Sequence, residues 1–200
     1  MKYLQSLLAL TIIFGVISCG DDDEPSAPAE ENAEEVITDV VLTFTPQGGG
    51  ATVTARAQDP DGDGPQDLQV LGDITLQSAS NYELTLSLTN EENPIDIEDI
   101  TAEIKEEAEE HMFFFSWTDG LFSDPTGNGN VDNRSDAVNY DDVDGDGLPL
   151  GLTTSWSTGP SASGSFRVIL KHQPDGIKTA TSGTSDGDTD IDISWQIVLR

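Results

Sequence analysis

The chain has 200 residues, and its 8 Lys and Arg against 38 Asp and Glu give a formal net charge of −30. This charge excludes nucleic acid and anionic membrane surfaces as partners, because both are bound through basic patches that displace counterions. The strong negative charge is better explained by divalent cations, cationic partners or a saline habitat. The length allows one domain of ordinary size with a single hydrophobic core.

Residues 1–18 have the pattern of a secretory signal, in which a lysine precedes an apolar run too short and too early for a membrane span. Residues 16–19 (VISC) resemble a bacterial lipobox, which would make Cys19 the acylated mature N-terminus. Cys19 is the only cysteine, so the mature chain would have no disulfide, thiol nucleophile or Cys-type metal site. The alternative is an ordinary cleavage site followed by a free cysteine.

An acidic tract, residues 20–24 (GDDDE), follows the cysteine, and Pro, Ala and Glu dominate up to Glu35. In some Gram-negative lipoproteins a similar tract directs the protein to the cell surface. The composition predicts a flexible tether over residues 19–35 rather than a folded segment. We therefore expect a folded domain at 36–200, monomeric and attached to the outer membrane by its lipid, at the cell surface or facing the periplasm.

The remaining sequence is mainly β in pattern and favours a single antiparallel β-sandwich with one inserted helix. The first two strands are expected to form a hairpin across the turn at 48–50, and 71–77 is expected to pair with 82–89. The predicted strands are 36–45, 51–57, 71–77, 82–89, 111–118, 152–157, 165–172 and 191–199.

The helix is expected at about residues 95–110. Asn93 is a favourable N-cap, and Pro94 suits the first helical position. An apolar stripe recurs every three or four residues at Ile97, Ile100, Ile104, Ala108 and His111. The glutamates off this stripe form a solvated acidic face or, alternatively, hold a cation near Glu106, Glu110 and His111.

The chain then changes to a period of two. His111, Phe113, Phe115 and Trp117 share one face of the predicted strand, and the opposite face begins with Met112 and Phe114. Since both faces are apolar, the strand should be covered on both sides, with the helix as one candidate cover.

The chain has only two histidines. His111 begins an apolar face, and His172 ends another, formed with Phe166, Val168 and Leu170. Two imidazoles at inward strand ends are candidates for a ligand site or a metal site for zinc or another transition metal, with Glu110 beside them. The alternative is a packed histidine hydrogen-bonded to the backbone.

Residues 59–67 (DPDGDGPQD) place carboxylates at the first, third, fifth and ninth positions and a glycine at the sixth. Such spacing can supply the six to eight oxygens that calcium prefers. It resembles thrombospondin-type and EF-hand-like loops, although Val70 stands where an EF-hand has its acidic twelfth residue. The alternative is a simple turn, which Asp and Gly also favour. The candidate ligands are Asp59, Asp61, Asp63 and Asp67.

Residues 142–147 (DVDGDG) form the next calcium candidate, with Asp142, Asp144 and Asp146 as ligands and Leu150 at the ninth position. Residues 124–132 (DPTGNGNVD) repeat the first loop with fewer carboxylates. The alternating aspartates of 186–192 could add a weak further site.

Taken together, the lipobox and the segments LTFTPQGGG, DPDGDG, EEAEEHMFFF, YDDVDGDGLPLGLTTSW and LKHQPD resemble a group of small lipoproteins of Gram-negative, Bacteroidota-type bacteria. Members often bear the name "type 1 periplasmic binding fold superfamily protein". That fold has two doubly wound lobes with many helices, which this chain cannot supply. The resemblance implies that His111 with its phenylalanine strand and His172 with its QPD turn recur in the group. It implies no established activity.

Three functions remain open. The first is a ligand- or metal-binding lipoprotein that serves an outer-membrane, TonB-dependent importer. The second is a calcium-stabilised structural or adhesive module without small-molecule cargo. The third is a glycan hydrolase, which the sequence disfavours because no paired carboxylates stand out on neighbouring strands. We expect a non-enzymatic protein of the first kind.

Overall fold

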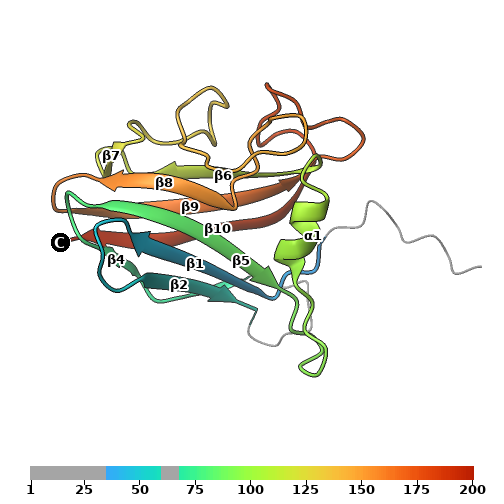
Figure 1. The fold of residues 1–200 in the computed structure, drawn as a ribbon, viewed down its shortest axis with the longest axis horizontal. Coiled ribbons are helices and arrows are strands. Elements are labelled where there is room, and N and C mark those ends of the chain that lie inside the picture. The colour runs from blue at the N-terminus through green and yellow to red at the C-terminus, as the bar shows by residue number, and fades with distance from the viewer. Residues whose placement is uncertain (1–34, 60–67) are drawn as a thin grey trace, which may run out of the picture. The chain divides into compact units, whose positions relative to one another are not determined.

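The computed structural model describes residues 35–59 and 68–200, and these residues belong to one compact unit. Within these residues two β-sheets face each other with a single short helix at one end (Figure 1). The mainly β, sandwich-like prediction is therefore confirmed. No helix in the described part of the chain is long and apolar enough to span a membrane. The elements are β1 Asp39–Pro46, β2 Val53–Gln58, β3 Gln69–Leu71, β4 Ile74–Leu76, β5 Asn81–Thr89, α1 Ile100–Glu106, β6 His111–Trp117, β7 Phe122–Asp124, β8 Thr153–Thr158, β9 Ala162–His172 and β10 Asp188–Leu199.

The first sheet has the order β3-β2-β1-β5-β8-β7 and the second β4-β10-β9-β6. The predicted β1–β2 hairpin is confirmed. The predicted pairing of 71–77 with 82–89 is wrong, because this segment is divided at Gly72, whose φ is 89°. β3 joins β2, whereas β4 crosses to the second sheet and pairs in parallel with β10. Ile74 and Leu76 are thereby buried in the core.

The core between the sheets is built around aromatic side chains. The Trp156 ring centroid lies 5.7 Å from that of Phe115, 5.2 Å from that of Phe166 and 4.7 Å from that of Phe122. Such edge and tilted contacts add to the free energy gained by area burial. The face of β5 that begins at Tyr82 is buried against this cluster, as its alternation predicts.

Strand β6 is buried on both faces, as predicted, but its outer cover differs from the prediction. Met112 and Phe114 pack with Ile169 in a second apolar cluster. The cover comes from the long connection between β7 and β8, which lies beside β6 (Figure 1) and contributes Val131 and Tyr140 to the cluster. From it Tyr140 packs on the cluster and donates its hydroxyl to Phe113 O at 2.6 Å. Helix α1 packs instead against β5.

Helix α1 is shorter than predicted and starts later. Asp99, not Asn93, is its N-cap, and the Asp99 side chain accepts a hydrogen bond from Ala102 N. Asn90 and Glu98 form an antiparallel bridge with two backbone hydrogen bonds, which holds the intervening residues in a loop. Ile97 is consequently 54% exposed. The later part of the predicted stripe, Ile100, Ile104, Ala108 and His111, is buried.

Candidate functional site

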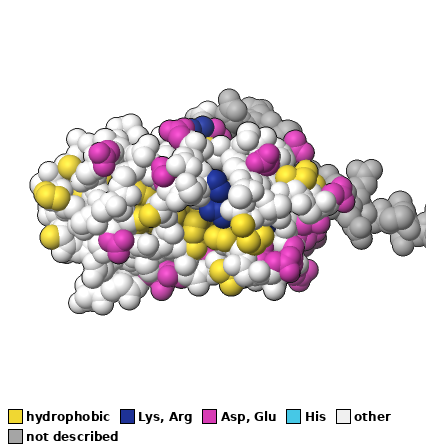
Figure 2. Space-filling view, turned by 90° about the horizontal axis from the view of Figure 1, so that it is seen from above, with side chains coloured by type: hydrophobic (Ala, Val, Ile, Leu, Met, Phe, Trp, Pro, Cys, Tyr) yellow, Lys and Arg dark blue, Asp and Glu magenta, His cyan; other side chains and the backbone are white. Residues whose placement is uncertain are grey.

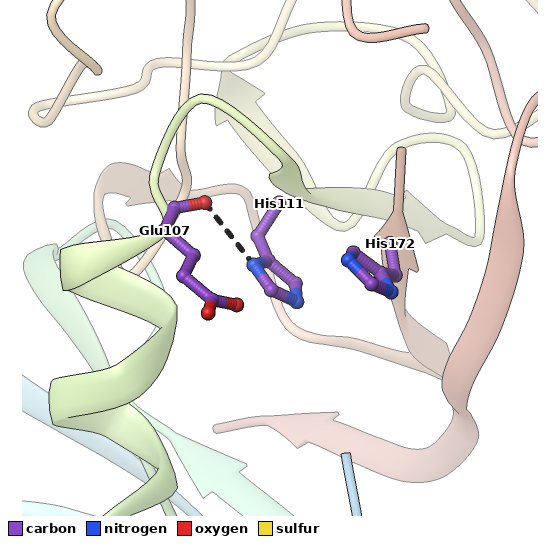
Figure 3. Close-up of side chains that lie close together, drawn as sticks. All are labelled: Glu107, His111 and His172. Atoms are coloured by element: carbon purple, nitrogen blue, oxygen red, sulfur yellow. Dashed lines mark hydrogen bonds between the residues drawn. The ribbon is translucent and has the colours of Figure 1, made fainter. Parts of the chain in front are cut away.

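The two histidines lie side by side at one end of the second sheet. The antiparallel pairing of β6 with β9 sets His111 directly opposite His172. Their rings stack with centroids 4.7 Å apart and planes 8° apart (Figure 3). The side chains are 0% and 3% exposed, and no histidine is visible on the face in Figure 2, where acidic side chains are scattered. Two sequence-predicted residues are thus neighbours in the interior.

The backbone sets the tautomer of His111. Its Nδ1 lies 3.2 Å from Glu107 O (Figure 3). A carbonyl oxygen only accepts, so Nδ1 carries the proton, and the Nε2 lone pair is left available. Nε2 has no hydrogen-bond partner among the described residues. A ring that donates through one nitrogen to a backbone carbonyl and offers the other is typical of metal-binding histidines.

Electrostatics keep His111 uncharged at neutral pH. Burial lowers its pKa to about 4; the Glu107 carbonyl opposes this decrease, while His172 and Lys178 add to it. A neutral imidazole is the form that binds a metal ion.

Carboxylates complete the cluster. One donor atom from each of Glu107, His111 and His172 lies within 4.8 Å of the other two. Glu110, which the sequence analysis placed beside the histidines, lies with its Oε2 3.5 Å from His172 Nε2. Burial raises the pKa of Glu107, and the charge of Glu110 raises it further, against the effect of His172. A cation beside Glu107 would favour the ionised carboxylate and so lower this pKa again.

The cluster is close to, but wider than, a metal coordination sphere. Tetrahedral zinc with bonds of about 2.0–2.1 Å holds its ligand atoms roughly 3.3 Å apart. The donors would therefore draw together on binding. One ring would also tilt, because the lone pairs of two parallel rings do not converge on one point. Both movements are local, since the strands already place the residues opposite each other.

The predicted calcium loop at 142–147 is held by the protein's own hydrogen-bond donors. Asp142 accepts from Gly151 N at 2.7 Å and Thr153 N at 3.1 Å. Asp144 accepts from Leu148 N at 2.8 Å through one oxygen, and its other oxygen lies 2.7 Å from Lys178 Nζ. The positive charge beside Asp144, one of the predicted calcium ligands, is thus supplied by the Lys178 ammonium group. The third predicted ligand, Asp146, is exposed.

The residues of the other predicted calcium segments lie in different environments. Asp59 is buried directly after β2, while Asp61, Asp63 and Asp67 lie outside the described residues, as does Cys19. In the 124–132 segment Asn130 serves the fold, accepting from Phe115 N at 3.0 Å and donating to Tyr140 Oη at 2.8 Å. The calcium site at 59–67 stays a prediction.

Sequence reasoning missed Glu107 as a site residue. Its position four residues before His111, at the C-cap of α1, was the available signal. Glu106, which the sequence placed beside a cation, is exposed and outside the cluster. Comparison with protein-family models, with curated proteins and with solved structures finds no significant match.

Proposed function

We propose that this chain is an extracytoplasmic, lipid-anchored protein that binds zinc or a similar transition-metal ion through Glu107, His111 and His172. The observation that carries the proposal is the buried pair of imidazoles with a carboxylate, whose donor atoms all lie within 4.8 Å of one another. Nitrogen and carboxylate ligands of this kind suit zinc.

The burial of the two rings supports binding over simple packing. His111 Nε2 and His172 Nε2 are both buried without a hydrogen-bond partner in the described part of the chain. A buried polar atom left without a partner costs about 1–3 kcal/mol. Coordination to a metal ion would satisfy both nitrogens at once.

The cellular setting follows from the N-terminal sequence. The signal pattern of 1–18, the lipobox at Cys19 and the Pro-, Ala- and Glu-rich composition of the segment that follows support a lipoprotein on the outer membrane, at the cell surface or facing the periplasm. We propose that it is monomeric. A carrier of metal in that position would serve an outer-membrane, TonB-dependent importer. The role needs binding and release, not catalysis, so we propose a non-enzymatic protein.

A calcium-stabilised structural module is the second candidate. The spacing of Asp59, Asp61, Asp63 and Asp67 favours it. The 142–147 loop supports it less, because Lys178 already neutralises Asp144.

Thermal melts of the full chain in chelator, in zinc and in calcium separate the two candidates. An ion at 100 times its Kd stabilises the folded state by about 2.7 kcal/mol, which raises Tm by roughly 5–10 °C at this size. We expect a zinc shift that His111→Ala/His172→Ala abolishes and that Glu106→Gln, at an exposed glutamate of the same helix, retains. A calcium shift lost only in Asp61→Ala/Asp63→Ala would favour the structural module. The absence of any shift would remove both candidates.

A further inference from the structure

Strand β10 contains an irregularity beside the histidines. Its pairing with β9 shifts register between Thr189 and Ile191, so Asp190 is an extra residue in a β-bulge. Bulges commonly change the direction of a side chain next to functional sites. Here the Asp190 side chain is 0% exposed, and its Oδ2 lies 4.0 Å from His111 Nε2.

The bulge is what turns Asp190 inward. Along β10, Ile191 and Ile193 point into the core, whereas Asp192 is exposed and pairs with Arg167 at 2.6 Å. Strict alternation would place Asp190 on the same outer side as Asp192. The inward carboxylate of Asp190 therefore differs from those of Asp188 and Asp192 on the same strand, which are exposed.

Two contacts hold the bulge in place. Lys171, on β9 and 3% exposed, donates from Nζ to Gly187 O at 2.8 Å and to Thr189 Oγ1 at 2.7 Å. Gly187 has a φ of 73°, and a Cβ there would lie 2.0 Å from His172 O. The segment before Asp190 is thus fixed tightly against the His172 backbone.

We propose that Asp190 is a direct ligand of the metal ion, bound on the Nε2 side of His111. This inference rests on the proposed function. His111 Nε2 and Asp190 Oδ2 lie 4.0 Å apart, and two ligand atoms of tetrahedral zinc lie roughly 3.3 Å apart. A small movement of the Asp190 carboxylate towards His111 would bring both atoms within bonding distance of one ion.

Asp190 also narrows the choice of metal. With His111, His172 and Glu107 it makes a set of two nitrogens and two carboxylates, whose charge balances a divalent ion. Such a set suits tetrahedral zinc. It lacks the thiolate or thioether ligands that select Cu(I), and it has too few oxygens for calcium.

The test is zinc affinity of the full chain, measured by competition with a chromophoric chelator, together with the visible spectrum of bound Co²⁺. We expect Asp190→Asn to weaken zinc binding by at least about tenfold and to change the tetrahedral Co²⁺ bands. Asp188→Asn, at an exposed aspartate of the same strand, should change neither. Melts of the metal-free variants establish that both are folded.

The outcomes separate this inference from the proposed function. Wild-type zinc affinity and an unchanged Co²⁺ spectrum in Asp190→Asn would overturn the ligand role and leave the proposed function standing. A change in the metal-free melt with unchanged affinity would overturn it as well, because it would give Asp190 a structural role only. Failure of the wild type to bind zinc would remove the proposed function, and this inference with it.

Discussion

Lys178 Nζ and Asp144 Oδ2 lie 2.7 Å apart, with the two side chains 0% and 1% exposed. Lys178 also donates to Ala108 O at 2.6 Å. One ammonium group therefore joins the turn after α1, the 142–147 loop and the connection between β9 and β10. The same turn carries Glu107 and leads into His111, so this buried ion pair supports the candidate site from outside it.

Removing the ammonium group should destabilise the fold strongly. Lys178→Met leaves Asp144 buried without its counter-charge, and breaking such a pair from one side costs about 3–5 kcal/mol. Urea unfolding at pH 7 measures the loss. Lys105→Met, at an exposed lysine of α1, is the control and should change stability by less than about 0.5 kcal/mol. A loss below about 1 kcal/mol for Lys178→Met would show that the ion pair contributes little to the free energy of unfolding.

Stability should fall in acid because of His111. Burial lowers its folded-state pKa from 6.5 to about 4. Between these pH values the His111 side chain is therefore protonated in the unfolded state and neutral in the folded state. The contribution is fully present above pH 6.5 and is lost progressively as the pH falls towards 4, by about 2–3 kcal/mol. His111→Gln should remove this part of the slope in denaturant titrations from pH 7.5 to 4. Parallel profiles for wild type and variant would contradict the assignment.

Glu35 should act with the opposite sign. Burial raises its pKa from 4.5 to about 7, and the charges of Glu103 and Glu107 raise it further. The folded state therefore holds a proton that the unfolded state loses, and the associated stability is present below pH 4.5 and is lost as the pH rises through 7. Glu35→Gln keeps the neutral form and should stabilise the protein at pH 8 by about 1–2 kcal/mol, after allowance for partial solvent screening. The gain should vanish at pH 4.5; an equal gain at both pH values would point to a cause other than titration.

Two glycines of one loop offer a matched test of close packing. Gly129 has a φ of 90°, and a Cβ there would lie 2.0 Å from Phe115 O on β6. Gly127 has a φ of 94° but nothing within 4 Å of its Cβ position. Gly127→Ala should cost only the backbone strain of about 1 kcal/mol, whereas Gly129→Ala must also displace the loop from β6 and should cost at least about 2 kcal/mol more. Urea unfolding of the two variants compares them directly, and equal losses would mean that the loop moves freely.

The side-chain alternation of β6 and β9 was sufficient to predict which residues face inward, including both histidines. Their pairing was not predictable, because the register of two strands distant in sequence depends on the whole sheet. Asn93 and Asp99 are both good caps, and the Asn90–Glu98 bridge, a tertiary contact, decides between them. The bulge at Asp190 was not predictable either, because the aspartates around it alternate as they would in a regular strand.

The position of β10 in the second sheet delays the assembly of part of that sheet. β10 lies between β4 and β9. β4 therefore cannot pair until β10 is present, because Ile74 is paired with Ile197, far along the chain. β1, β2 and β5 are synthesised early and can pair with one another, whereas β4 has no partner in the second sheet until residues 188–199 have been synthesised. Long-range pairing of this kind slows folding. If the chain is exported, as we propose, this delay would keep it unfolded, and therefore able to pass through an export channel, until its last strand has been made.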